Sequence, residues 1–322
     1  MRIVFFGTPQ FAVPTLDRLL ASGHSIVGVV TQPDRPRGRG QRVTEGPVKT
    51  VALTHGVPVM QPDRLKTPEF LDAFAAMSAD LGVVAAYGKI LPEDVLRIPR
   101  LGLINVHASL LPRWRGAAPV ERAVMAGDTE TGVTIMRVVR QLDAGPTFAM
   151  TTRTIGLDET AQEVERDLAR LGAELLAQVV NRMAQGHLEE TPQDDTLATY
   201  APRLTKEEGL LDWKQPAVAI HNRVRGLHPW PHAFSFLGGS RSIILRTSTG
   251  EGPGGSEPRD AAAAPGTVCE ASGDRFTVAA GDGLVRILEI QPEGRRPMHA
   301  REFLAGHPVR PGARFDSPAS PR

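Results

Sequence analysis

The stretch Met1–Phe11, MRIVFFGTPQF, contains the first element of the predicted fold. Its apolar run Ile3–Phe6 ends at a Gly-Thr-Pro turn, and Leu16 and Leu19 continue a helical pattern, which predicts a strand, a turn and a helix. Further apolar runs predict strands at Ser25–Thr31, Leu81–Tyr87 and Leu103–His107. Such runs, separated by segments of crossover length, are typical of a sheet covered on both faces. We therefore predict an α/β fold whose N-terminal part is an open wound, mainly parallel sheet.

The end of this first domain is marked by a long amphipathic helix. Two expected strands, Gly132–Val139 and Phe148–Ile155, precede a capping box of Thr160 and Glu163, and the apolar periodicity continues until Gly186. A polar, proline-containing stretch follows and is typical of a connection between domains. We predict a catalytic domain over 1–188, a linker over 189–207, a second domain over 208–315 and a flexible tail over 316–322.

The second domain has a different pattern of short elements. After a short helix around Ile220, strands are expected at Arg241–Thr247, Gly266–Glu270, Arg275–Ala279 and Leu284–Ile290. Short strands with frequent turn signals indicate a small antiparallel β-barrel, similar to an OB fold.

Composition excludes several classes of protein. The chain has 322 residues and a formal net charge of +1, so a surface that is basic throughout is excluded and any contact with nucleic acid must be local. A single cysteine, Cys269, rules out an intramolecular disulfide and a cysteine-rich metal site. The apolar run at the N-terminus is too short for a signal peptide, and no stretch has the roughly 20 apolar residues of a membrane span. We expect a cytoplasmic protein, without a membrane partner and monomeric.

Two polar residues occupy the carboxyl end of the strand Leu103–His107. Asn105 and His107 are two residues apart, so they project from the same side at the edge where open α/β sheets bind ligands. An amide and an imidazole directed at one point suit a carbonyl that becomes an oxyanion, but the same residues can simply satisfy backbone groups at a strand end. Asp143, before Gly145, could orient the imidazole or could only form a turn. No further ligands stand at metal-binding spacing from His107, so no metal is predicted.

The longest informative motif is NVHASLLPRWRGAAP, Asn105–Pro119, followed by GVTIM and LDAG. Together with GTPQF, TQPDRPRGRG, AYGKILP and, in the second domain, HPWP, it closely resembles the folate-dependent formyltransferases over nearly the whole chain. The resemblance implies a Rossmann-like catalytic domain and a formyl transfer from the cosubstrate 10-formyl-tetrahydrofolate to the α-amino group of methionyl initiator tRNA. It further implies Asn105, His107 and Asp143 as catalytic residues, acting without a metal or a covalent intermediate.

Folate and RNA contacts also follow from the resemblance. It implies that the cosubstrate binds at seven positions: Tyr87, Gly88, Ile90, Ser109, Leu110, Leu111 and Pro112. Arg113 and Arg115 next to them could pair with the folate tail or with RNA. The family pattern of Thr-Gly-Asp after the catalytic aspartate is replaced here by Ala144-Gly145-Pro146, which puts the fine positioning of Asp143 in question.

An arginine-rich loop, Thr31–Arg42, follows a strand end at the rim of the expected site. It is predicted to contact the acceptor end of tRNA through Arg35, Arg37, Arg39 and Arg42, although solvated charged loops of this kind are common. Gln41 and Arg42 stand where the family usually has lysine, so an RNA contact of Gln41 is in doubt.

Other activities remain as alternatives. A formyltransferase for a small amine, such as glycinamide ribonucleotide or an amino sugar, would share the catalytic motif, and a hydrolase of formyl-tetrahydrofolate would also share it. A dinucleotide-binding enzyme is disfavoured because Gly7-Thr8-Pro9 lacks the spaced glycines of that fingerprint.

Overall fold

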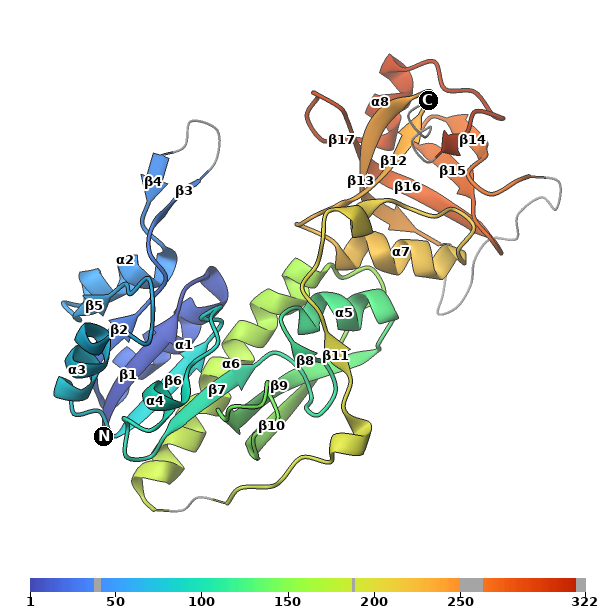
Figure 1. The fold of residues 1–322 in the computed structure, drawn as a ribbon. Coiled ribbons are helices and arrows are strands. Elements are labelled where there is room, and N and C mark those ends of the chain that lie inside the picture. Colours follow the sequence, from blue (N-terminus) through green and yellow to red (C-terminus); the bar gives the residue numbers. More distant parts are fainter. Residues whose placement is uncertain (38–41, 187–188, 250–262, 317–322) are drawn as a thin grey trace. The chain divides into compact units, whose positions relative to one another are not determined.

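The computed structural model describes residues 1–37, 42–186, 189–249 and 263–316, and these form two compact units (Figure 1). The first unit comprises Met1–Pro119, Thr131–Arg153 and Glu165–Pro202. The second unit contains two internal segments, Val120–Glu130 and Thr154–Val164, and the described residues from Arg203 onward. The chain therefore enters the second unit twice before residue 203, whereas the sequence predicts a single boundary after residue 188. No helix among the described residues is long and apolar enough to cross a membrane.

A seven-stranded sheet forms the centre of the first unit. Its strands are β1 (Arg2–Gly7), β2 (Ser25–Val30), β5 (Val59–Met60), β6 (Leu81–Ala85), β7 (Leu103–His107), β9 (Glu130–Arg137) and β10 (Thr147–Thr154). Their order is β10-β9-β7-β6-β1-β2-β5; the strands from β7 to β5 are parallel, and β9 is antiparallel to β7. The predicted open, mainly parallel sheet is confirmed.

Helices pack against this sheet because its central strands are apolar on both faces. Ile3, Val4, Phe5 and Phe6 of β1 are fully buried. The helical elements of the first unit are η1 (Gln10–Ala12), α1 (Val13–Leu20), α2 (Pro47–Thr54), α3 (Pro68–Ala76), α4 (Glu93–Leu96) and most of α6 (Ala161–Ala184). Helix α5 (Pro119–Ala126) lies almost entirely in the second unit. The predicted capping box is present before α6: the Thr160 amide donates to Glu163 Oε2 (2.8 Å), and the Glu163 amide donates to Thr160 Oγ1 (3.3 Å).

The strand order reverses between β1 and β6. From β1 the chain adds β2 and β5 on one side of the sheet, and it then adds β6 and β7 on the other side. In open α/β sheets, ligands bind beyond the carboxyl ends of the strands at such a point. The loops after β1, β6 and β7 therefore lie where a ligand site is expected.

Two small ribbons complete the first unit. An antiparallel ribbon pairs β3 (Arg35–Arg37) with β4 (Arg42–Thr44), and a parallel one pairs β8 (Arg115–Gly116) with β11 (Tyr200–Ala201). The residues before β11 form η2 (Asp195–Leu197), and Thr191 exchanges backbone hydrogen bonds with Thr147. Most of the predicted linker 189–207 thus packs on the first unit, and its role as a domain boundary stays a prediction.

The part of the second unit after residue 203 is a curled antiparallel sheet with the helices α7 and α8. Its described elements are η3 (Glu207–Gly209), α7 (Ala217–Gly226), β12 (Ala233–Leu237), β13 (Ser240–Ser248), β14 (Val268–Ser272), β15 (Arg275–Ala279), β16 (Leu284–Pro292), β17 (Met298–His299), α8 (Ala300–Gly306) and β18 (Phe315–Asp316). The strand order is β14-β15-β16-β13-β12-β18, and β17 pairs with β16. A bridge between Thr267 and Arg314 joins the two edges of this sheet. The predicted antiparallel barrel is confirmed, but Asp316, the first residue of the predicted tail, pairs with Phe236 in the sheet; residues 317–322 lie outside the described part of the chain.

Buried polar contacts explain why the segment before α6 belongs to the second unit. Arg225 of α7 is buried and donates to the carbonyls of Gly156 (3.2 Å) and Glu159 (3.0 Å). His221 of the same helix is bonded to the Leu157 carbonyl (2.9 Å). Because buried polar groups need partners, these contacts tie residues 156–159 to α7.

Candidate active site

Strand β7 presents the two polar residues that the sequence singles out. Its apolar residues Leu103, Ile104 and Val106 are buried in the sheet, and β9 lies opposite, with His107 paired to Thr134. Asn105 and His107, two residues apart, lie on the same face of the strand. His107 is buried, whereas Asn105 is half-buried, and its side chain makes no hydrogen bond to any described residue. The Asn105 amide is therefore able to donate to a ligand.

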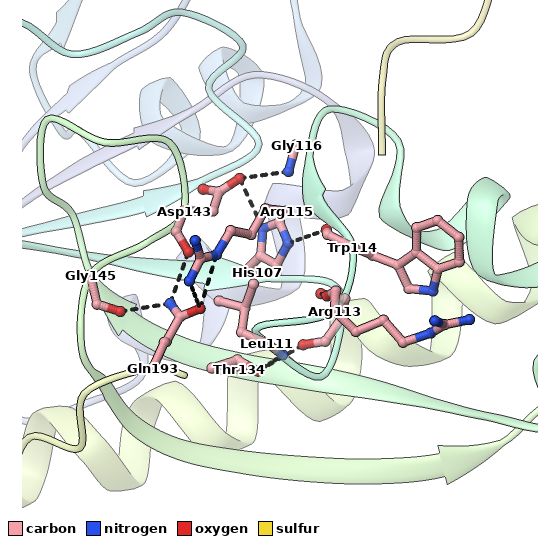
Figure 2. Close-up of polar contacts among 11 residues, drawn as sticks. His107, Leu111, Arg113, Trp114, Arg115, Gly116, Thr134, Asp143, Gly145 and Gln193 are labelled. Atoms are coloured by element: carbon pink, nitrogen blue, oxygen red, sulfur yellow. Dashed lines mark hydrogen bonds and ion pairs between the residues drawn. The ribbon is translucent and has the colours of Figure 1, made fainter. Parts of the chain in front are cut away.

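The His107 imidazole lies between a carbonyl and a carboxylate (Figure 2). Its Nε2 is 2.9 Å from the Trp114 carbonyl oxygen, and its Nδ1 is 3.8 Å from Asp143 Oδ2. A carbonyl only accepts, so Nε2 carries a hydrogen, and Nδ1 is the nitrogen that gains or loses a proton. The distance to Asp143 is too long for a hydrogen bond, but it allows an ion pair with a protonated ring. The structure thus brings His107 and Asp143 together.

Asp143 lies in a constrained loop between β9 and β10. Its φ of +47° is in the left-handed region, which few residues other than glycine adopt, and Asp143 Oδ2 accepts a hydrogen bond from the Gly116 amide (2.9 Å). A Cβ on Gly145 would lie 1.9 Å from the Arg137 carbonyl oxygen, so only glycine fits there. Pro146 does not disturb this loop, because its carbonyl still accepts from the Arg137 amide (2.9 Å).

Arg115 and Gln193 support this loop, and no local sequence pattern indicates either role. Arg115 is 1% exposed; its guanidinium donates to Gln193 Oε1 (3.1 and 2.8 Å) and pairs with Asp195 (2.7 Å). The suggestion that Arg115 contacts folate or RNA is therefore wrong, because the side chain is committed to internal contacts. Gln193 in turn donates to the carbonyls of Asp143 (2.8 Å) and Gly145 (2.7 Å) (Figure 2). A glutamine in a polar connection carries no sequence signal for such a contact.

The predicted folate stretch Ser109–Pro112 forms a tightly bonded turn. Ser109 is fully buried and donates to the Arg113 carbonyl (2.6 Å), while Thr134 Oγ1 donates to the Ser109 carbonyl (2.7 Å) and accepts from the Leu111 amide (3.1 Å). Leu111 is also buried, and Leu110 and Pro112 are half-buried. The Ser109 hydroxyl is thus bonded within the turn itself.

The three other predicted folate residues differ in exposure. Tyr87 is buried, its ring lies edge-on to Phe6 (5.5 Å between centroids), and burial raises the pKa of its hydroxyl to about 12. The Tyr87 ring is therefore part of the hydrophobic core of the first unit. Gly88 adopts a φ of +81°, which turns the chain toward Ile90, and Ile90 is 84% exposed.

Ile90 lines a cavity of about 660 Å³. Basic and apolar side chains meet there with two acidic ones; the lining residues are Leu65, Lys66, Lys89, Ile90, Leu91, Pro92, Glu93, Asp94 and Arg140. Lys89 is held by the Pro62 and Asp63 carbonyls (3.0 Å each). Arg140 lies two residues before Leu142, which is 55% exposed in the Asp143 loop. Exposed apolar side chains beside cations suit a flat organic ligand with an acidic end.

Three of the predicted RNA-binding arginines, Arg35, Arg37 and Arg42, lie on the ribbon β3–β4 and not on an irregular loop. Arg35 is exposed on β3, and Arg37 pairs with Arg42 across the ribbon through the backbone. Arg39 and Gln41 lie outside the described residues. At the base of the ribbon, Asp34 accepts hydrogen bonds from Lys49 and from Gln61 (3.1 Å). The hydrogen bond from Lys49 is the main reason that the pKa of Asp34 is lowered.

Among the described residues there is no cluster of three or more histidine, cysteine, aspartate or glutamate side chains that could hold a metal ion. The polar side chains that the end of β7 and the loop after β9 present are those of Asn105, His107 and Asp143. A hydrogen-bonding amide, an imidazole and a carboxylate can together stabilise an oxyanion and move a proton. This arrangement suits acyl transfer.

Comparisons with known proteins agree with this chemistry. Residues 1–180 match the profile of the formyl transferase family, and residues 203–308 match the formyl transferase C-terminal domain. The chain therefore belongs to the formyltransferase family.

Similar full-length proteins narrow the class. The methionyl-tRNA formyltransferase of Citrifermentans bemidjiense is 47% identical over 97% of this chain and 95% of its own length. That of Methylococcus capsulatus is 48% identical over 95% of this chain and 97% of its own. The structure of an N-formyltransferase from Helicobacter canadensis, in complex with folinic acid and dTDP-3-aminofucose, has the same fold with a TM-score of 0.64 at 15% identity, over 88% of this chain and 97% of that one.

Proposed function

We propose that this protein has methionyl-tRNA formyltransferase activity: it transfers a formyl group from 10-formyl-tetrahydrofolate to the α-amino group of methionyl initiator tRNA. The observation that carries the proposal is the near full-length similarity to relatives of that name, in a chain that holds His107 and Asp143 side by side at the end of β7.

The reaction is an acyl transfer in which Asn105, His107 and Asp143 act on the formyl group and on a proton. The unprotonated α-amine forms a bond to the formyl carbon, and the carbonyl oxygen becomes an oxyanion. Asn105 and the Nδ1–H of protonated His107 donate to this oxygen. The bond from carbon to the folate nitrogen then breaks, and the nitrogen receives the electron pair. Asp143 accepts the proton that the amine loses, His107 gives its Nδ1 proton to the folate nitrogen, and the proton on Asp143 then passes to His107.

No strong base is required for the attack. An α-amino group titrates near ~8, so a substantial fraction is already unprotonated at neutral pH. The proposed route therefore needs neither a metal ion nor a covalent enzyme intermediate.

The cavity beside Ile90 is the proposed site of the folate cosubstrate. Ile90 and Leu142 expose apolar surface, and Lys66 and Arg140 supply positive charge for the carboxylates of a folate tail. Gly88 and the turn Ser109–Pro112 would contribute backbone and shape, because the Ser109 hydroxyl is bonded within the turn and the Leu111 side chain is buried. The proposed ligand of this cavity is the 10-formyl form of tetrahydrofolate.

The ribbon β3–β4 is the proposed contact for the acceptor end of the tRNA. The segment Thr31–Arg42 carries four arginines in sequence, Arg35, Arg37, Arg39 and Arg42, and arginine binds phosphate and stacks on unpaired bases. The barrel of the second unit is the proposed contact for the body of the tRNA, over the predicted domain 208–315. We further propose that the enzyme is cytoplasmic and monomeric.

A direct assay tests this function against its alternatives. Purified protein with 10-formyl-tetrahydrofolate is given methionyl initiator tRNA, glycinamide ribonucleotide, an amino sugar nucleotide or water alone. We expect formylation of the methionyl-tRNA and no significant turnover with the other acceptors. Formylation of a small amine at a comparable kcat/KM, or release of formate without an acceptor, would overturn the proposal.

A further inference from the structure

The Gln193 side chain connects a buried cation to the backbone of the Asp143 loop (Figure 2). Its oxygen accepts two hydrogen bonds from Arg115, and its nitrogen donates to the carbonyls of Asp143 and Gly145. The orientation of this amide is unambiguous, since a guanidinium only donates and a carbonyl only accepts. All four contacts are between 2.7 and 3.1 Å, so the amide uses both of its hydrogens and its oxygen.

We propose that Gln193, held by Arg115, is a positioning residue that fixes the Asp143 loop in its catalytic conformation. The inference rests on the proposed function, because it assigns Gln193 a role through Asp143. Gln193 touches neither His107 nor any residue that lines the Ile90 cavity in the contacts of the described residues, so its effect must pass through the loop.

Gln193 adds a support from outside the loop to the contacts that Asp143 makes with Gly116 and Pro146 makes with Arg137. Asp143 has a left-handed φ, a conformation that carries a steric cost in residues other than glycine, and Leu142 beside it is 55% exposed and contributes little packing. Gln193 binds the carbonyls on both sides of Ala144 and offsets this cost. The carboxylate of Asp143 is thereby kept within reach of Gly116 and His107.

The same chain segment also positions the partner of the Asp143 carboxylate. The Arg115 amide donates to the Thr199 carbonyl (2.9 Å), and the Ala117 amide donates to that of Ala201 (2.8 Å). A Cβ on Gly116 would lie 2.6 Å from the Ala201 carbonyl oxygen, so β11 lies directly against β8. Residues 193–201 therefore hold the loop backbone through Gln193 and hold the Gly116 amide through β11.

Burial of Arg115 makes the support rigid. A buried guanidinium is tolerated only when its hydrogens are bonded, and here Gln193 and Asp195 bind it, with Asp195 itself 69% exposed at the side chain. Loss of the Gln193 donors would leave Arg115 bonded but would release the loop.

The test is the near-isosteric Gln193→Glu substitution. The glutamate still accepts from Arg115, but it cannot donate to the carbonyls of Asp143 and Gly145. We expect kcat for methionyl-tRNA formylation to fall roughly 10- to 100-fold, since displacements near 1 Å at a reacting group have effects of this size. KM for both substrates should change by less than about twofold. The matched control is the same substitution at an exposed glutamine of α6, Gln178→Glu, which should keep kcat within about threefold of the wild type.

A double-mutant cycle separates positioning from a general structural effect. In an Asp143→Asn background, Gln193→Met should reduce kcat no further, because its effect depends on the Asp143 carboxylate. Multiplicative losses would overturn the proposal, and so would wild-type kcat in both Gln193 variants. If neither Gln193 variant shows a cooperative thermal transition, the residue is required for folding and the proposal is equally overturned. Absence of formylation by the wild-type protein would instead contradict the proposed function.

Discussion

The ribbon β3–β4 and the segment Thr191–Ala201 are both polar connections of the first unit, and they are held in different ways. The segment Thr191–Ala201 is bonded along its length: Thr191 to Thr147, Gln193 to the Asp143 loop, and Tyr200 and Ala201 to β8. The ribbon extends away from the sheet of its unit, and the ion pair of Asp34 with Lys49 lies at its base (Figure 1).

This difference matches two different tasks. A group that must meet a reacting atom has to be fixed to a fraction of an ångström, which requires directional contacts from several sides. A group that binds phosphate works at longer range and has to adapt to its partner. The contacts of each segment therefore predict which kinetic constant it controls: kcat for the Asp143 side and the use of RNA for the ribbon.

The largest effect is expected at the centre of the catalytic group. His107→Ala removes the proposed oxyanion donor and proton carrier, so kcat should fall by about 10³-fold. The affinity for methionyl-tRNA should stay within about twofold, because the ribbon is unchanged. Single-turnover formylation and equilibrium binding measure the two quantities, and thermal unfolding shows whether the variant is folded. A parallel loss of tRNA affinity would remove the distinction between the two regions.

A smaller effect with the opposite signature is expected on the ribbon. The double variant Arg35→Ala and Arg42→Ala should lower kcat/KM for methionyl-tRNA roughly 10-fold and leave kcat at saturating tRNA near the wild-type value. The slope of log affinity against log salt should decrease by about one unit for each phosphate that the variant no longer binds. Arg18→Ala is the matched control, since Arg18 is an arginine of the same unit on α1 that pairs with Glu174. An unchanged salt slope in the ribbon variant would contradict a phosphate contact.

Local patterns made the strands and the catalytic strand predictable. The run Leu103–His107 coincides with β7, and Arg275–Ala279 coincides with β15, because apolar residues bounded by turn residues leave little choice of element. The capping box of Thr160 and Glu163 was predictable for the same reason, since both partners lie within one turn of chain. The family motif pointed to Asn105, His107 and Asp143.

Contacts distant in sequence were not predictable. Gln193 lies 50 residues after Asp143, and nothing in the polar stretch around it indicates that its amide binds that loop. From its residue type alone, Arg115 is a candidate for binding phosphate. Its burial excludes that role, and only the pairing of β8 with β11 reveals that burial. The arginine-rich loop was expected to be irregular, because a hairpin of three-residue strands leaves no periodic signal.

The smallest expected effect is at the anchor of the ribbon. Asp34→Asn keeps an acceptor for Gln61 but removes the charge that pairs with Lys49. We expect kcat/KM for methionyl-tRNA to fall by about two- to threefold, because this pair is one contact among several at a partly exposed site. The lowered pKa of Asp34 also predicts a pH dependence. A carboxyl group whose pKa is depressed in the folded state stabilises the fold above its unfolded pKa of about 3.9 and loses that contribution as pH falls through the folded pKa.

The unfolding midpoint of Asp34→Asn should therefore lie roughly 1–3 °C below that of the wild type at pH 7, and the two midpoints should converge as the pH falls below about 4. Thermal melts from pH 3 to pH 7 measure this difference. If the variant keeps the wild-type midpoint at every pH but loses the use of tRNA as strongly as the double arginine variant, Asp34 contributes to RNA binding directly. The RNA-binding surface would then include the base of the ribbon. The comparison with the segment Thr191–Ala201 would in that case depend only on the kcat effects at the Asp143 loop.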